Sequence, residues 1–73
     1  MSYIVYSKED CVFCEKAKTL LTKHAIPFEE YVVPKHLTLR ELKEQFPLAR
    51  TVPIILKDGK MIGGYAELQA ILT

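Results

Sequence analysis

The chain has 73 residues, enough for one small domain, which we expect to span residues 1–73. Hydrophobic residues make up 49% and charged residues 26%, which allows a buried core and a soluble surface, while a formal charge of +1 provides no basic field for nucleic acid. The apolar runs are too short to span a membrane, and the first residues lack the basic and apolar regions of a signal peptide, so we expect a cytoplasmic protein.

The first half of the chain predicts a strand, a helix and a second strand. Residues 3–6 are aromatic and β-branched, as in a short buried strand. Residues 12–24 carry an apolar stripe at helical spacing, formed by Phe13, Ala17, Leu20 and Leu21. Pro27 follows the end of this helix, and residues 28–33 read as the second strand.

The second half predicts a helix, a hairpin and a last helix. Thr38 and Glu41 have the spacing of a capping box, and they open a helix that Pro47 ends. Residues 51–56 and 61–62 are expected strands, and Asp58-Gly59 between them is a strong hairpin signal. Gly63-Gly64 ends the hairpin, and residues 65–72 form an amphipathic helix with Leu68, Ile71 and Leu72 on its apolar side.

The predicted order is therefore β-α-β-α-β-β-α, an α/β fold. The first two strands should be parallel and joined by a right-handed crossover. The hairpin makes the last two strands antiparallel. We expect a four-stranded mixed sheet flanked by three helices, with helices on both faces.

Cys11 and Cys14 are the two cysteines of the chain, and they lie where the first strand gives way to the first helix. This spacing brings two sulfurs within disulfide reach, and a helix N-terminus stabilises a thiolate at Cys11, the form that attacks disulfides. Two other interpretations compete: a pair of small buried side chains, and a zinc site. Zinc needs two more ligands, and His24 and His36 make no ligand pattern with the cysteines, so we expect no metal.

Four features together resemble the dithiol glutaredoxins of the thioredoxin-like superfamily over essentially the full length of the chain. They are the C-x-x-C pair beside a βαβ pattern, Lys8, Thr51-Val52-Pro53 and Gly63-Gly64. The resemblance implies a thioredoxin-like fold and an enzyme in which Cys11 attacks a disulfide and Cys14 resolves the mixed disulfide. It also implies glutathione as the reducing co-substrate, with protein disulfides, such as that of ribonucleotide reductase, and glutathione mixed disulfides as substrates.

The resemblance also implies a set of glutathione-binding residues. Lys8 would acidify Cys11 and pair with a glutathione carboxylate, Pro53 would follow a cis peptide bond and face the cysteines, and the main chain of Val52 would pair with the tripeptide. Main-chain N–H groups at the start of the last helix would bind the γ-glutamyl carboxylate. The full set is Lys8, Phe13, Arg40, Thr51, Val52, Pro53, Gly64 and Tyr65. Lys8 and Arg40 also fit solvated surface charges, and Gly63-Gly64 also fits a plain turn.

The chain departs from the family at two places, and these departures leave alternatives open. Ala66 stands where glutaredoxins often have an Asp that meets the glutathione amine, which makes a donor protein reduced by thioredoxin reductase a second hypothesis. Val12-Phe13 replaces the commonest Pro-Tyr, and the loss of the proline leaves open a third hypothesis, an iron–sulfur cluster carrier. We expect a monomer with no nucleic-acid or membrane partner.

Overall fold

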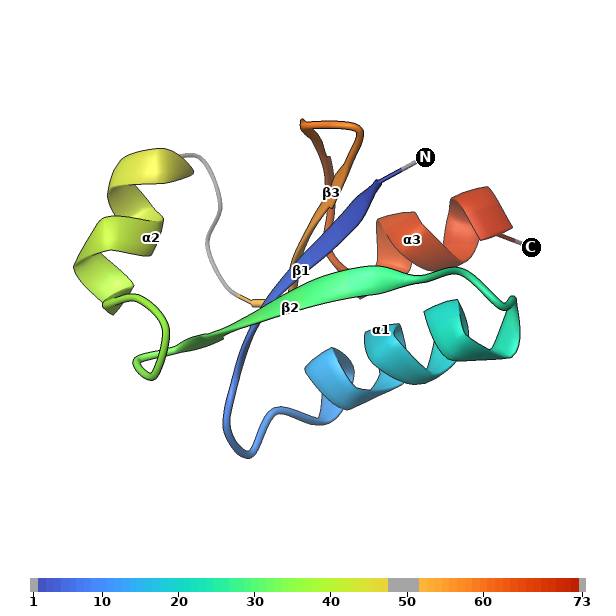
Figure 1. Cartoon of the computed structure of the whole chain (residues 1–73), viewed down its shortest axis with the longest axis horizontal. Coiled ribbons are helices and arrows are strands. Elements are labelled where there is room, and N and C mark those ends of the chain that lie inside the picture. Colours follow the sequence, from blue (N-terminus) through green and yellow to red (C-terminus); the bar gives the residue numbers. More distant parts are fainter. Residues whose placement is uncertain (1, 48–51, 73) are drawn as a thin grey trace.

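Four strands form one mixed sheet in the computed structural model, which describes residues 2–47 and 52–72 (Figure 1). The elements in chain order are β1 (Tyr3–Lys8), α1 (Val12–Lys23), β2 (Phe28–Val33), α2 (Leu39–Gln45), β3 (Ile54–Lys57), β4 (Lys60–Gly63) and α3 (Tyr65–Leu72). The strand order across the sheet is β2-β1-β3-β4. β1 is parallel to β2 and antiparallel to β3, and β3 is antiparallel to β4. The predicted mixed four-stranded sheet and element order are confirmed.

The alternating side chains of β1 divide the core into two clusters. Tyr3 and Val5 point to the face covered by α1 and α3, where they meet a set of fully buried side chains: Ala17, Leu21, Ile55 and Leu68. Tyr6 points to the opposite face, where the second cluster consists of Val33, Leu42 and Ile54 with Phe46 packed against it. Helices therefore cover both faces of the sheet, α1 and α3 side by side on one and α2 on the other (Figure 1).

Two strand boundaries differ by two or more residues from the sequence prediction, and the others by one residue at most. β1 runs two residues beyond the predicted end, because Ser7 and Lys8 continue the parallel ladder opposite Val32 and Val33. β3 starts at Ile54, later than the predicted residue 51. Pro53, directly before it, has no N–H to donate to a ladder, so regular pairing starts after the proline.

The caps and turns agree with the sequence pattern. Thr38 caps α2, and both hydrogen bonds of the capping box with Glu41 are present. Asp58 and Gly59, both at positive φ, make the turn between β3 and β4. Within the described residues, no helix has the length and apolar character needed to cross a membrane.

Candidate active site

Cys11 and Cys14 lie at the start of α1 and form a disulfide, with their Cα atoms 5.2 Å apart. This separation is within the usual range for a disulfide, so the local backbone holds the two residues at bonding distance. Cys11 is half-buried, whereas the side chain of Cys14 has no exposed surface. An external thiol or disulfide can therefore reach Cys11 and not Cys14.

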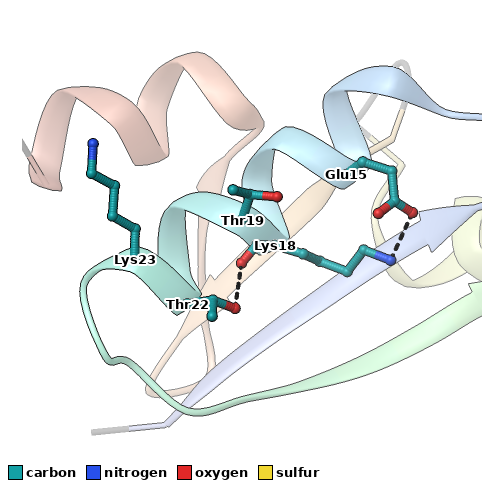
Figure 2. Close-up of a pocket in the computed structure, with 5 residues that line it drawn as sticks. All are labelled: Glu15, Lys18, Thr19, Thr22 and Lys23. Carbon is teal, nitrogen blue, oxygen red and sulfur yellow. Dashed lines mark hydrogen bonds and ion pairs between the residues drawn. The ribbon is translucent and has the colours of Figure 1, made fainter.

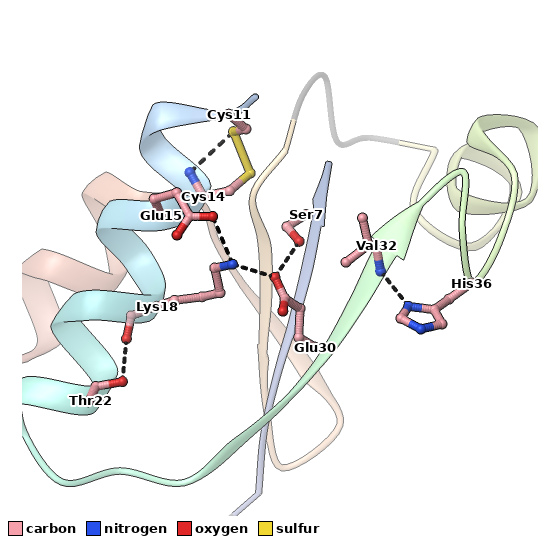
Figure 3. A network of polar contacts seen from close by, with 9 residues as sticks. All are labelled: Ser7, Cys11, Cys14, Glu15, Lys18, Thr22, Glu30, Val32 and His36. Atoms are coloured by element: carbon pink, nitrogen blue, oxygen red, sulfur yellow. Dashed lines mark hydrogen bonds and ion pairs between the residues drawn. A yellow bond between two sulfur atoms is a disulfide. The ribbon is translucent and has the colours of Figure 1, made fainter. Parts of the chain in front are cut away.

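The sulfur of Cys11 caps the helix that carries both cysteines. Cys11 is the N-cap residue of α1 in an extended conformation, and its Sγ accepts a hydrogen bond of 3.2 Å from the main-chain N–H of Cys14 (Figure 3). The first N–H groups of a helix have no partner within the helix, and the positive end of its dipole lies there. Both effects favour negative charge on this sulfur, so reduction leaves a stabilised thiolate at Cys11.

The two residues between the cysteines present exposed apolar side chains. Val12 and Phe13, the residues between the cysteines, are 66% and 56% exposed. The Phe13 ring lies 6.0 Å from the ring of Tyr65 at the start of α3, and the Lys16 ammonium lies 5.2 Å from the Phe13 ring centre. The structure thus brings together two of the predicted glutathione-binding residues, Phe13 from α1 and Tyr65 from α3.

Gly64 brings the start of α3 against the loop that precedes β3. A Cβ atom at Gly64 would lie 3.3 Å from the carbonyl oxygen of Pro53, so glycine permits this close approach. The Val52–Pro53 peptide bond is cis, as the resemblance implies, and Pro53 is buried. Two further predicted residues, Pro53 and Gly64, are therefore neighbours.

A carboxylate that the sequence prediction did not assign lies at the start of α3. Glu67 accepts a hydrogen bond of 2.7 Å from the main-chain N–H of Gly64 through its Oε1 atom. Gly63, at φ +123°, makes room for it, because a Cβ there would lie 2.5 Å from the same oxygen. Glu67 is the third residue of α3, the position from which a capping-box carboxylate accepts a hydrogen bond from the N-cap N–H. This position could have been recognised in the sequence.

Of the remaining predicted residues, Lys8 lies on β1, Arg40 on α2 and Val52 directly before Pro53. Lys8 is exposed at the end of β1, three residues before Cys11. Arg40 is paired along α2 with Glu44, Nε to Oε1 3.6 Å, and its side chain is 88% exposed. Thr51 lies outside the described residues, and Val52 is half-buried. The glutathione-binding roles of all these residues stay predictions.

A polar cluster that the sequence did not indicate lies beside the cysteines, between α1 and the sheet (Figure 3). The Lys18 ammonium contacts Glu15 at 2.9 Å and Glu30 at 2.8 Å, and the buried Ser7 hydroxyl donates to the same Glu30 oxygen at 2.8 Å. The cluster thus ties the first turns of α1 to the two strands β1 and β2.

These contacts shift the pKa values of the central ion pair in opposite directions. Burial alone would raise the pKa of Glu30, but the hydrogen bonds from Lys18 and Ser7 and the Lys18 charge outweigh it and hold the pKa below 4.5. The hydrogen bond to Glu30 raises the pKa of Lys18 above 10.5, against a smaller opposing effect of burial. Both groups are therefore charged at neutral pH.

The lowered pKa of Glu30 predicts a loss of stability in acid. The stabilisation from the Glu30 carboxylate is fully present above the pKa of this group in the unfolded chain, near 4.5. It is lost as the pH falls through the lower pKa that the group has in the folded protein. Thermal unfolding of the wild-type protein and Glu30→Gln from pH 7 to pH 3 measures this. The stability advantage of the wild type should shrink as the pH falls below about 4.5; an advantage that grows in acid would contradict the assignment.

A shallow pocket follows the outer surface of α1 (Figure 2). It is lined by Glu15, Lys18, Thr19, Thr22 and Lys23. Thr22 bonds back to the Lys18 carbonyl oxygen at 2.9 Å, and Lys23 points away from the Lys18–Glu15 pair. None of the residues predicted to bind glutathione lines this pocket.

The comparisons with known proteins agree with this geometry. The chain matches the Glutaredoxin family over residues 3–62. The chain belongs to the glutaredoxin family. It is 34% identical to glutaredoxin 3 of Escherichia coli strain K12 over 67 residues, which cover 92% of this chain and 81% of the relative.

Solved glutaredoxin structures share the fold. Glutaredoxin 1 from Francisella tularensis, complexed with cacodylate, superposes with a TM-score of 0.84 at 25% identity, covering 94% of this chain and 88% of that one. The buckwheat glutaredoxin–glutathione complex superposes with a TM-score of 0.80 at 24% identity, covering 93% of this chain and 64% of that one. As a glutaredoxin whose Cys11 and Cys14 lie within disulfide distance, the protein is a thiol–disulfide oxidoreductase.

Proposed function

We propose that this glutaredoxin reduces protein disulfides and glutathione mixed disulfides with glutathione as its electron donor. The observation that carries the proposal is the difference between the two sulfurs. Cys11 is half-buried and accepts the Cys14 N–H, whereas Cys14 is fully buried behind it. Cys11 is thus suited to attack a substrate disulfide, and Cys14 is suited to form the disulfide with Cys11 afterwards.

The proposed reaction proceeds by four thiol–disulfide exchanges. The Cys11 thiolate attacks a client disulfide, forms a bond to one client sulfur and releases the other as a thiolate. Cys14 then attacks the Cys11 sulfur, which releases the second client thiol and leaves the Cys11–Cys14 disulfide. One glutathione thiolate reopens this disulfide at Cys11, and a second removes the first as glutathione disulfide. Two electrons pass in total from two glutathione molecules to the client.

Glutathione is proposed to bind across the start of α1, the Val52–Pro53 loop and the start of α3. Three observations support this place: the Phe13–Tyr65 ring contact, the approach of Gly64 to Pro53 and the exposure of Lys8 three residues before Cys11. The buckwheat relative, which shares the fold, was solved as a glutathione complex. Because Glu67 already accepts the Gly64 N–H, the γ-glutamyl carboxylate would use the next N–H groups of α3.

The clients are proposed to be proteins with accessible disulfides, including reductases such as ribonucleotide reductase that end each turnover with an internal disulfide. The apolar surface of Val12 and Phe13 suits contact with a protein around its disulfide. We further propose that the protein acts as a monomer in the cytoplasm, where thiols are kept reduced.

A comparison of two electron donors tests the proposed function. One assay supplies NADPH, glutathione reductase and glutathione, and the other supplies NADPH and thioredoxin reductase, each with the same small disulfide as substrate. We expect the glutathione system to support turnover at least about tenfold faster, a difference of about 1.4 kcal/mol in activation free energy. Faster turnover with thioredoxin reductase would overturn glutathione dependence and leave the dithiol chemistry intact.

A further inference from the structure

Two members of the ion cluster, Glu15 and Lys18, lie close to the dithiol in sequence, and the third, Glu30, contacts Lys18 from β2. Glu15 directly follows Cys14, and Lys18 comes four residues after Cys14, on the same side of α1. Residues four apart on a helix have Cβ atoms about 5–6 Å from each other. Figure 3 shows the Lys18 ammonium on the side of α1 that carries Cys14, between the two carboxylates.

The cluster has an unbalanced charge. One ammonium faces two carboxylates, so the three side chains together carry one negative charge. The side chains of Lys18 and Glu30 are only 23% and 29% exposed, whereas Glu15 is 71% exposed. Water therefore screens the Lys18 and Glu30 charges less than it screens an ordinary surface pair.

We propose that Glu15, Lys18 and Glu30 act as positioning residues that set, through their charges, how readily the Cys11–Cys14 disulfide is reduced. Reduction adds two electrons and one proton to the disulfide and yields a Cys11 thiolate and a Cys14 thiol. The thiolate is the new negative charge. The Lys18 charge stabilises it and the two carboxylates destabilise it, so each residue shifts the balance between the oxidised and the reduced protein.

A direct effect of the charges on Cys11 can be distinguished from a purely structural role of the Lys18–Glu30 contact. If the cluster only held α1 against β2, loss of either Lys18 or Glu30 would break the same contact and change the dithiol in the same direction. If the charges act directly, removal of the ammonium and removal of a carboxylate have opposite effects. Lys18→Met should disfavour the Cys11 thiolate, and Glu30→Gln should favour it.

The first measurement is the pH dependence of Cys11 alkylation in the reduced protein. The pH at which half of Cys11 is thiolate should rise in Lys18→Met and fall in Glu30→Gln, each by about 0.3–1 pH unit. Glu15→Gln, at an exposed position where folding is not at risk, should give a smaller fall. Lys18→Arg keeps the charge and should restore the wild-type titration.

The second measurement is the reduction potential, determined against dithiothreitol so that the result is independent of glutathione. Lys18→Met should make the disulfide harder to reduce by about twofold to tenfold in the equilibrium constant, and Glu30→Gln easier by a similar factor. Tenfold corresponds to about 30 mV. Both variants should lose thermal stability, because both break the Lys18–Glu30 pair.

Lys23→Met is the matched control, since it removes the same charge from the same helix. Lys23 is exposed and lies nine residues beyond Cys14, about 13 Å along the helix, which exceeds the screening length of about 8 Å at physiological salt. It should leave the titration and the potential unchanged. Shifts of the same sign in Lys18→Met and Glu30→Gln, or shifts no larger than in Lys23→Met, would overturn the proposal. Failure of the glutathione assay alone would leave it standing.

Discussion

Cys11→Ser should reduce the rate of disulfide reduction to the uncatalysed background. A serine hydroxyl stays protonated at neutral pH, so the variant has no nucleophile at the capping position, and the remaining thiol, Cys14, has no exposed surface. The measurement is NADPH consumption in a coupled assay with a small disulfide and with a protein disulfide. Circular dichroism of the variant checks that the fold is intact.

Cys14→Ser is the matched control for this prediction. It removes a sulfur from the same turn of α1 but leaves the capping thiol in place. It should keep turnover of glutathione mixed disulfides, which need one thiol, and lose most of its activity on protein disulfides, which need the second thiol for release. Equal activity of the two variants on both substrates would contradict the assigned roles.

Leu21→Ala should destabilise the protein by about 3 kcal/mol. The Leu21 side chain is fully buried in the cluster that joins α1, α3 and the sheet, and its truncation leaves a cavity that the packed neighbours cannot fill. The total stability of so small a domain is roughly 5–10 kcal/mol. In a domain of this size, a loss of about 3 kcal/mol should lower the melting temperature by at least about 12 °C.

Ile71→Ala is the control for the cavity. Ile71 lies on α3 but is 50% exposed, so the change removes surface that already contacts water. The free energy of unfolding should change by less than about 0.5 kcal/mol. Urea unfolding of both variants at pH 7 measures the difference. Equal losses in the two variants would show that Leu21 does not anchor α1 on the sheet.

The fold could be predicted from the sequence because its local signals agree with one another. The stripe on residues 12–24, the Thr38–Glu41 capping box and the Asp58-Gly59 turn each specify one element, and all three are present in the structure. The predicted start of β3 was wrong. The residues around Pro53 have high β-propensity, but the proline has no N–H to donate to a strand ladder.

The position of the dithiol could be predicted as well, but its polar surroundings could not. The C-x-x-C spacing and the following helix place Cys11 at the cap. Lys18 and Glu30 are twelve residues apart in the sequence, and only the parallel pairing of β1 and β2 below α1 brings them together. A single lysine on a helix gives no signal of such a partner. The contact depends on tertiary structure, and so does the proposed electrostatic control.

The most direct test of the account is the alkylation rate of Cys11 in the reduced wild-type protein, measured with iodoacetamide from pH 3 to pH 10. The capping hydrogen bond and the helix dipole predict that the rate reaches half its maximum at least one unit below the value of an ordinary thiol, about 8.5. A midpoint at or above 8.5 would contradict the central claim that the fold prepares this sulfur for attack.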